Sequence, residues 1–376
     1  MADLERGPLL DILAGIFTRP FDEPLNDAEF NAIALRLFAR QYERNAPYAA
    51  FCARRGRAPE AVSHWTRIPP VPTAAFREVA LVAGNPDDAH AVFRTSGTTR
   101  GPERRGVHYI PDLSVYHASL IRNFAACMLP DGARLRMVSI VPASREMPDS
   151  SLAHMIDVVL SRLGAGQGTH CATVDGGIDA QALSATLHEA ERSGVPVCLL
   201  GTSFSFVHWL DGLVERGERF RLPDGSRLMD TGGYKGRSRE VEEPVLREMY
   251  RELLGIPATH CVNEYGMTEM CSQFYDSTLR DTLRGRDAAR RKLVPPWVRT
   301  RVVHPETLEP LSSGETGILQ HFDLANAGSV MAIQTEDLGV QVEGGFRLIG
   351  RARGVTPRGC SIAMDILLDA VRERSD

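Results

Sequence analysis

The sequence predicts a protein of the α/β class, with mostly parallel strands flanked by helices. From residue 90 onward, short apolar strand-like runs such as 137–141 and 195–200 alternate with helical patterns, and this alternation is typical of parallel α/β sheets. After about residue 300, short apolar segments are separated by Gly, Glu and Asp, which predicts an additional small antiparallel β unit. The first 88 residues are predicted to be mainly helices and connectors.

The clearest early helix is predicted over residues 27–44. Asn26 followed by Glu29 forms a plausible capping box at its start. The segment 68–72 contains three prolines and is predicted to be a connector, because proline suits neither a helix interior nor a central strand. The apolar residues of the helix recur near helical spacing: Phe30, Ile33, Leu37, Phe38 and Tyr42.

The later elements follow the same patterns. Helices are predicted over 113–124, over 179–193 with Gly194 as the closing residue, and over 241–254. The run 199–207 is interpreted as a strand entering a loop, and 259–262 as another strand. Glu343-Gly344-Gly345 suits a hairpin turn. The last helix is predicted over 362–373.

Composition limits the functional classes. The 376 residues allow two or three domains, or one large α/β domain with an appendage. The net charge of −5 argues against a protein that mainly binds bulk nucleic acid. No apolar run approaches the ~18 residues of a membrane span, and the start lacks a basic region followed by an apolar core. The seven cysteines contain no C-x-x-C pair, so a cytoplasmic protein with reduced thiols is expected.

Three short motifs carry the chemical signal. The first is the hydroxyl-rich loop, residues 95–102, which reads Thr-Ser-Gly-Thr-Thr-Arg-Gly-Pro. Its small residues permit close approach of a ligand, and its hydroxyls and N–H groups suit phosphate oxygens. It lacks the spacing and lysine of a Walker A loop. The alternative is an ordinary Gly/Thr turn after a strand.

The second and third motifs are acidic. Residues 263–269 read Asn-Glu-Tyr-Gly-Met-Thr-Glu after a predicted strand, and a Thr hydroxyl beside a carboxylate suits a phosphate held with Mg²⁺. Residues 334–339 read Gln-Thr-Glu-Asp-Leu-Gly and are followed by Gly350-Arg351. An aspartate there suits the two hydroxyls of a ribose. The alternatives are a solvent-exposed Glu269, a turn carboxylate and a surface arginine.

Taken in order, with Gly232-Gly233 between the first two, these motifs resemble the set that marks the adenylate-forming superfamily of acyl-CoA synthetases, luciferase and adenylation domains. The resemblance runs from about residue 90 to 361. The continuation of the second motif into 271–275, the short chain and Arg358-Gly359-Cys360-Ser361 most resemble the acyl-protein synthetase (LuxE-type) family. Phenylacetate-CoA ligases are the next nearest resemblance.

The resemblance implies that a carboxylate attacks the α-phosphate of ATP, releases pyrophosphate and passes its acyl group to a thiol. ATP and Mg²⁺ are the implied cofactors. The implied roles are phosphate binding for Thr95, Ser96, Gly97, Thr98 and Thr99; contact with the adenine and acyl path for Gly232, Gly233, Tyr234 and Gly266; base stacking for Tyr265; contact with the α-phosphate for Thr268; Mg²⁺ binding for Glu269; ribose binding for Asp337 and Arg351; and acyl acceptance for Cys360.

Two features depart from the superfamily pattern. Glu103 stands where most members carry a lysine, and the last lysine of the chain is Lys292. We therefore expect an adenylation domain over 1–349 and a vestigial C-terminal segment over 350–376. A basic residue would assist the first step in place of the usual lysine, with Lys235, Arg351 and Arg358 as candidates; a partner protein could do so instead, or adenylation is impaired.

The acyl pocket is expected to be apolar and to include Phe204 and Val207 beside Gly233 and Gly266, by analogy with the superfamily; the alternative is plain core packing. The acid is a fatty or an aromatic one. His170-Cys171 and His260-Cys261 match no strong zinc spacing. The Arg-rich stretch 280–292 suggests a solvated helix face, or a docking surface for an acidic carrier protein.

Three functions remain open on the sequence. The first is an acyl-protein synthetase that acylates its own Cys360. The second is a ligase that loads coenzyme A, a carrier protein or a reductase partner. The third is a non-catalytic subunit that binds a nucleotide or an acyl group, which the missing lysine favours. A small-molecule carboxylic acid is the expected substrate of the first two.

Overall fold

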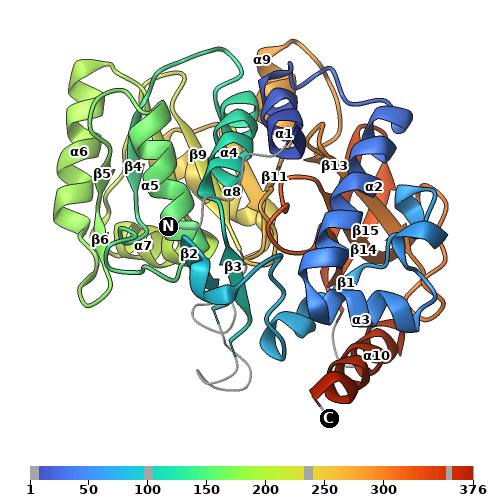
Figure 1. Cartoon of the computed structure of the whole chain (residues 1–376). Coiled ribbons are helices and arrows are strands. Elements are labelled where there is room, and N and C mark those ends of the chain that lie inside the picture. Colours follow the sequence, from blue (N-terminus) through green and yellow to red (C-terminus); the bar gives the residue numbers. More distant parts are fainter. Residues whose placement is uncertain (1–7, 97–104, 233–239, 353–357, 376) are drawn as a thin grey trace. The chain divides into compact units, whose positions relative to one another are not determined.

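The computed structural model describes residues 8–96, 105–232, 240–352 and 358–375 (Figure 1). Within 358–375, side chains are described only at 363–370 and 372. Contacts divide the chain into two compact units: unit 1 takes the described residues within 1–123, 267–273 and 291–376, and unit 2 takes those within 124–266 and 274–290. The described residues of the predicted vestigial segment 350–376 group with unit 1, and the division of the chain at residue 350 stays a prediction.

Unit 1 is built on a six-stranded sheet with the order β12-β16-β15-β14-β13, to which β1 adds in parallel beside β15. Neighbouring strands along the main path are antiparallel. This sheet contains the antiparallel β unit predicted after residue 300. Its strands are β1 (Val71–Pro72), β12 (Lys292–Leu293), β13 (Val298–Val303), β14 (Thr316–Asp323), β15 (Ala332–Val342) and β16 (Gly345–Arg351).

The other elements of unit 1 are helices, short 3₁₀ turns and a hairpin. Helix α10 packs against α3, β1 and η3 and buries Ala363, Leu367 and Ala370. The elements are α1 (Pro8–Thr18), α2 (Asp27–Arg44), α3 (Ala46–Arg54), η1 (Pro59–Ala61), η2 (Trp65–Arg67), η3 (Thr73–Arg77), η4 (Pro86–Asp88), the antiparallel pair β2 (Ala91–Arg94) and β3 (Val107–Ile110), the first part of α4 (Leu113–Met128), and α10 (Arg358–Ser375).

Unit 2 is the α/β part that the sequence predicts. Its main sheet has the order β11-β10-β9-β8-β4-β5, parallel except for β11. Its elements are the end of α4, β4 (Arg136–Ser139), α5 (Ser151–Leu163), β5 (Thr169–His170), the short pair β6 (Ala172–Thr173) and β7 (Gly177–Ile178), α6 (Ala180–Ser193), β8 (Val197–Thr202), α7 (Ser203–Arg216), β9 (Arg227–Thr231), α8 (Glu243–Leu254), η6 (Ala258–His260), β10 (Cys261–Tyr265), β11 (Phe274–Tyr275) and α9 (Thr278–Leu283).

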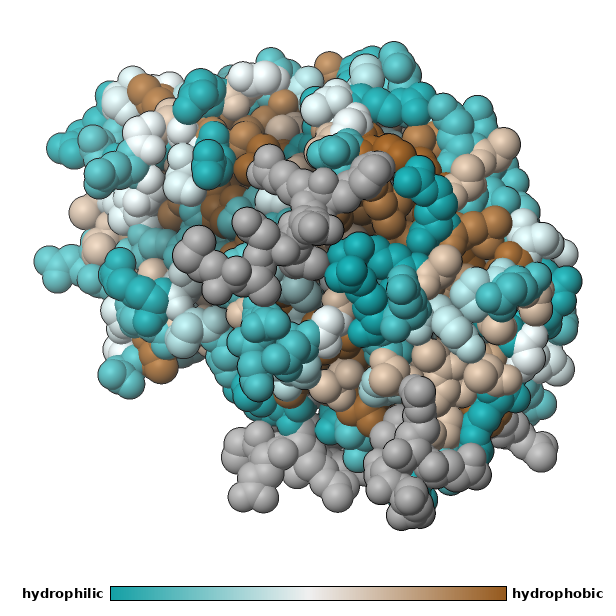
Figure 2. All heavy atoms as spheres, viewed as in Figure 1, coloured by the Kyte–Doolittle hydropathy of each residue, from teal (hydrophilic) through white to brown (hydrophobic). Residues whose placement is uncertain are grey.

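Each unit has its own apolar core. In unit 1 the Trp297 ring meets Phe17 edge-on at 5.0 Å, and Trp65 meets Phe322 at the same distance. In unit 2 the buried residues of β8 and α7, including Leu199 and Phe206, pack with Tyr250 of α8. Hydrophilic side chains cover much of the face seen in Figure 2, with apolar ones between them. Among the described residues, no helix is both long and apolar enough to cross a membrane.

Several predicted elements are confirmed. Helix α2 has the predicted bounds, and its start is a capping box in which Asn26 accepts from Glu29 N and Glu29 accepts from Asn26 N, both at 2.9 Å. Gly194 closes α6 with a φ of +69°. The turn at 343–345 joins β15 to β16, and Gly344 takes the positive φ of +74° that favours glycine there.

Other boundaries differ from the prediction for local reasons. The predicted loop before residue 207 is the first turn of α7, because the Thr202 hydroxyl caps the helix by accepting from Ser205 N at 3.1 Å. The strand predicted from residue 259 starts at Cys261, after a 3₁₀ turn. The last helix spans 358–375, longer than predicted. The proline connector 68–72 contains the short edge strand β1.

The capping box of α2 gives a first prediction. Replacing Asn26 with Ala removes the acceptor of the Glu29 N–H, and we expect the free energy of unfolding to fall by about 1 kcal/mol. Urea unfolding followed by circular dichroism measures this change. Asn26→Asp keeps a capping oxygen and serves as the control. Equal losses in both variants would contradict the capping explanation.

Candidate functional site

The second motif is divided between the two units. Tyr265 ends β10 and Gly266 is the last residue of this part of unit 2, whereas the 267–273 loop belongs to unit 1. The loop contains neither helix nor strand, so its backbone groups need partners from elsewhere in the fold.

Asp323 is the main anchor of the 267–273 loop. This residue ends β14 and is fully buried. Its carboxylate accepts from Cys271 N at 3.2 Å, from Ser272 N at 2.9 Å and from the Ser272 hydroxyl at 2.7 Å. Ala325 N donates to it at 2.9 Å, and Trp297 Nε1 donates to the Ser272 hydroxyl at 2.9 Å. Burial outweighs these bonds and raises the pKa of Asp323 to about 6.

Two more buried side chains bind the backbone of Thr268 and Glu269. Asn326 Nδ2 donates to the Glu269 carbonyl at 2.9 Å. His108 Nδ1 donates to the Thr268 carbonyl at 2.6 Å. Burial lowers the pKa of His108 to about 4, so its ring is neutral at physiological pH. The backbone on both sides of the Thr268–Glu269 peptide is therefore fixed by neutral donors.

The Glu269 carboxyl is buried and is influenced by nearby charged side chains. The residue is 8% exposed, and burial raises the pKa of its carboxyl to about 7. The positive charges of Arg77 and Arg351 oppose this rise, and the negative charge of Asp337 adds to it. A carboxylate that burial makes costly and cations stabilise is typical of a functional site.

The third motif lies on the neighbouring hairpin of unit 1. Asp337 on β15 is the register partner of Arg351 on β16. Arg351 Nη2 is 2.9 Å from a carboxylate oxygen of Glu336. The Thr335 hydroxyl donates to the Leu319 carbonyl and accepts from Asp337 N at 3.0 Å. The structure thus brings Asp337 and Arg351 together, as the resemblance implies, within electrostatic range of Glu269.

The hydroxyl-rich loop starts from the β2–β3 hairpin. Thr95 N donates to the Gly106 carbonyl at 2.9 Å, and Gly106 N donates to the Thr95 hydroxyl at 2.8 Å. Arg105 Nη2 donates to the Arg94 carbonyl at 3.1 Å. These bonds close the base of the loop beside Ser96. Gly97, Thr98 and Thr99 lie outside the described residues.

In unit 2 the ends of β9 and β10 carry the remaining motif residues. The Thr231 hydroxyl donates to the buried Glu264 carboxylate. A Cβ at Gly266 would clash with a Glu264 carboxylate oxygen, so a side chain there would have to displace the buried Glu264 side chain. The Tyr265 ring packs on Phe274 at 5.7 Å. Gly232 follows β9 with a φ of +74°, and Gly233 and Tyr234 lie outside the described residues.

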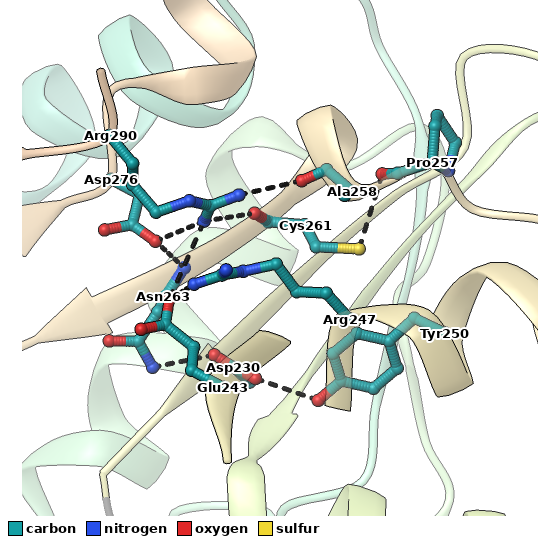
Figure 3. A network of polar contacts seen from close by, with 10 residues as sticks. All are labelled: Asp230, Glu243, Arg247, Tyr250, Pro257, Ala258, Cys261, Asn263, Asp276 and Arg290. Carbon is teal, nitrogen blue, oxygen red and sulfur yellow. Dashed lines mark hydrogen bonds and ion pairs between the residues drawn. The ribbon is translucent and has the colours of Figure 1, made fainter. Parts of the chain in front are cut away.

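A polar network fixes these two strand ends (Figure 3). Asp230 accepts from Asn263 Nδ2 and from the Tyr250 hydroxyl, each at 2.8 Å. Asp276 accepts from Asn263 N at 3.0 Å and from Arg290 Nη1 at 2.6 Å. Asp230 and Asn263 are register partners on β9 and β10. The network therefore fixes the pairing of the two strands two residues before Gly232 and Tyr265.

The residues predicted to line an acyl pocket lie on α7. Phe204 is half-buried, whereas Val207 is fully buried within the apolar core of unit 2. Val207 therefore has the core packing that the sequence left as the alternative, and its role in a pocket stays a prediction. The backbone of Cys360 lies in the first turn of α10, but its side chain lies outside the described residues.

The Arg-rich stretch 280–292 is not a single solvated helix face. Arg280 is buried and donates to the Ala126 carbonyl at 3.1 Å. Arg290 belongs to the network of Figure 3, and Lys292 is buried in β12. Arg284 and Arg286 are exposed. Among the described residues, no three His, Cys, Asp or Glu side chains gather as a metal site.

Sequence reasoning missed the residues that hold the site. Asp323, Asn326 and His108 carry no motif, and their partners lie far along the chain. The sequence offers one weak indication for the first two: Asp323 and Asn326 are polar residues among the apolar and small residues 322–327, at the end of a strand. Arg77 has no such signal, because only the fold brings it near Glu269.

Comparisons with solved structures identify the class. A crystal structure of 2-hydroxyisobutyryl-CoA ligase in an open conformation, in complex with 2-HIB-AMP and CoA, matches with a TM-score of 0.61. It is 16% identical and the match covers 88% of this chain and 71% of that one. The chain therefore has the fold of the adenylate-forming enzymes, as its sequence predicts.

The family follows from sequence. The model of the family "Acyl-protein synthetase, LuxE" matches residues 16–368, so the chain belongs to this family. A long-chain-fatty-acid–luciferin-component ligase of Vibrio harveyi is 26% identical over 341 residues, which cover 86% of this chain and 84% of the relative. A ligase of the same name from Aliivibrio fischeri is 24% identical over 312 residues, 81% and 77% of the two chains.

The anchor of the loop gives a second prediction. Asp323→Ala leaves the N–H groups of Cys271, Ser272 and Ala325 without their acceptor, and we expect the free energy of unfolding to fall by about 3 kcal/mol or more. Denaturant unfolding measures the loss. Asp88→Ala, at an exposed carboxylate of unit 1, is the control and should cost little. A small loss at Asp323 would refute its anchoring role.

The buried carboxylate gives a third prediction. Because folding raises the pKa of Glu269 from about 4.5 to about 7, the folded state binds the proton more tightly than the unfolded chain. Its contribution to stability is therefore largest below pH 4.5 and is lost as the pH rises through 7. At pH 8 we expect Glu269→Gln to stabilise the free protein by roughly 1–3 kcal/mol.

Thermal unfolding between pH 5 and pH 8 tests this sign. Glu269→Gln should unfold at a higher temperature than the parent protein at pH 8, and the difference should shrink toward pH 5. Glu343→Gln, at an exposed carboxylate of the same unit, should show neither effect. A variant that loses stability at pH 8 would disprove the electrostatic cost assigned to Glu269.

Proposed function

We propose that this enzyme activates a long-chain fatty acid with ATP, as an acyl-adenylate, and transfers the acyl group to the thiol of Cys360. The observation that carries this proposal is the fixed 267–273 loop, which presents Glu269 beside Asp337 and Arg351 in a member of the acyl-protein synthetase family. The names of the two Vibrionaceae relatives support the choice of a long-chain fatty acid.

The first step needs charge neutralisation and alignment more than proton transfer. A substrate carboxylate oxygen attacks the α-phosphorus of ATP, the bond to the β-phosphate oxygen breaks, and pyrophosphate leaves. Because both reactants are anions, fixed cations and N–H donors lower the barrier by holding them together. Thr268 would contact the α-phosphate, while Asp337 and Arg351 would hold the ribose hydroxyls and orient the nucleotide.

Glu269 fits a magnesium ion. Its carboxylate is buried, and its charge is unfavourable there without a cation, as the raised pKa shows. Oxygen donors of this kind are the ligands that Mg²⁺ takes in nucleotide sites. Bound there, Mg²⁺ would neutralise charge on the phosphate oxygens. The backbone bonds from Asn326 and His108 would keep the carboxylate in place with or without the ion.

The cysteines that the structure describes support Cys360 as the acceptor. Six of the seven are buried: Cys52, Cys127, Cys171, Cys198, Cys261 and Cys271. Burial raises the pKa of five of them, to about 12 for Cys52 and Cys198 and about 11 for Cys171. Such thiols form little thiolate, which is the reactive form. Cys360 is the remaining cysteine and the one that the resemblance to the acyl-protein synthetases implies as the acceptor.

In the second step the Cys360 sulfur attacks the acyl carbon. The thiol proton leaves to solvent or a base, the bond between the acyl carbon and the AMP oxygen breaks, and AMP departs. A thioester on the protein results. Transfer to CoA, a carrier protein or a reductase partner is the second outcome, and it does not need Cys360 as the acceptor.

Intact-protein mass spectrometry tests the proposed function. After incubation with ATP, Mg²⁺ and a pool of fatty and aromatic acids, we expect an added mass equal to one fatty acyl group. Cys360→Ser should lose the adduct while still releasing pyrophosphate. Cys171→Ala, at a buried thiol, should retain it.

The same assay separates the alternatives. Pyrophosphate release without an adduct in the parent protein would move the acceptor to CoA or a partner thiol. An adduct that persists in Cys360→Ser would place it elsewhere. Glu269→Gln should reduce Mg²⁺-dependent pyrophosphate release by about 100-fold or more, because a charge that stabilises the transition state is lost.

A further inference from the structure

Arg77 is a cation of unit 1 that no motif assigns. It is the last residue of η3 and is exposed. Within the part of the chain that the structure describes, its side chain makes neither a hydrogen bond nor an ion pair. Arg351, in contrast, is paired with Glu336 at 2.9 Å, and Arg105 donates to the Arg94 carbonyl at 3.1 Å. The Arg77 guanidinium therefore keeps its donors for another ligand.

The residue before Arg77 fixes where η3 lies. Phe76 is buried and packs edge-to-face on His108, with 5.6 Å between the ring centres. A Cβ at Gly106 would lie 3.5 Å from the Phe76 Cβ and 3.0 Å from Thr95. Phe76 thus sits against the base of the hydroxyl-rich loop and against the histidine that holds Thr268. Arg77 follows at the end of this packed turn.

The two arginines near Glu269 come from different elements. Arg351 lies on β16 with Asp337 as its register partner on β15, the pair proposed to hold the ribose. Arg77 lies on η3, next to Phe76, which packs on His108 and lies close to Gly106. The positive charges of both arginines act on Glu269. Arg77 therefore follows a residue packed at the base of the hydroxyl-rich loop, whereas Arg351 lies on the hairpin of the third motif.

We propose that Arg77 binds the β- and γ-phosphates of ATP beside Glu269. A planar guanidinium with unused N–H donors matches phosphate oxygens in shape and charge. The chain contains two lysines, and the described one, Lys292, is buried in β12, so arginines are the main cations available to this unit. The proposal rests on the proposed function, because it assumes that ATP is the nucleotide.

The proposal predicts that loss of Arg77 weakens the binding of ATP but not of AMP, since AMP lacks the two phosphates assigned to Arg77. Isothermal titration calorimetry with ATP and with AMP, each with Mg²⁺, compares the parent protein with Arg77→Gln. We expect the dissociation constant for ATP to rise roughly tenfold or more, as for loss of a charge-assisted hydrogen bond. The dissociation constant for AMP should change by less than about twofold. The dissociation constant of Arg77→Lys for ATP should lie between those of the parent protein and Arg77→Gln, because lysine keeps the charge but lacks the planar guanidinium.

Arg67 provides the matched control. It ends η2 as Arg77 ends η3, it is exposed, and it belongs to the same unit. Arg67→Gln removes the same charge and should leave ATP binding unchanged. Thermal unfolding checks that Arg77→Gln and Arg67→Gln remain folded under the conditions of the titration.

The outcomes distinguish the two proposals. Parent-like ATP binding by Arg77→Gln, an equal loss of ATP and AMP binding, or an equal loss in Arg67→Gln would each overturn the role of Arg77 while leaving adenylation intact. A parent protein that binds neither ATP nor AMP would overturn the proposed function, and with it the role of Arg77.

Discussion

The candidate site depends on one buried carboxylate. The 267–273 loop has no regular structure, so most of its N–H groups have no helical or sheet partner, and those of Cys271 and Ser272 depend on a side chain. Asp323 accepts two of these N–H groups and the Ser272 hydroxyl from the end of β14. Removing the anchor would leave the N–H groups of Cys271 and Ser272 without their acceptor, directly after Glu269 and Met270.

The other supports act on the same loop from different elements. His108 comes from β3 and Asn326 from the turn after β14, and each binds a backbone carbonyl of the Thr268–Glu269 pair. A second buried amide, Gln41 on α2, donates to the Asn326 carbonyl at 2.9 Å and accepts from Met331 N at 3.0 Å. Helices and strands therefore support the site through hydrogen bonds between buried polar groups, and such buried networks rigidify a core.

This arrangement has an electrostatic cost that serves the chemistry. Burial disfavours the charge of Glu269, and Arg77 and Arg351 offset only part of that cost. Such a carboxylate gains more from a bound cation than an exposed one would, because its competing interaction with water has already been lost. Active sites commonly give up stability in this way in exchange for function. Arg77 and Arg351 are also the cations proposed to bind the anionic nucleotide.

The sequence by itself determined the fold class, the order of the main elements and the motif residues. Alternating apolar runs and helical spacing are local, so the parallel sheet, α2 with its capping box and the β15–β16 turn could be predicted from short windows. The motif order likewise pointed to the adenylate-forming fold and to this family. The prediction that the strand in 199–207 enters a loop was wrong, because the Thr202 hydroxyl caps helix α7, which begins at Ser203.

The tertiary structure alone decided how the motifs are held. Asp323 lies about fifty residues from the loop it anchors, and His108 lies 160 residues from Thr268. Arg77 follows Phe76, which packs on His108, and its charge acts on Glu269. The tertiary structure also showed that 280–292 contributes the buried Arg280 and the partly buried Arg290 to unit 2, as well as exposed arginines. Local patterns specify helices and strands, but partners distant in sequence meet only after the core has formed, and the burial that shifts the pKa of Glu269 arises only there.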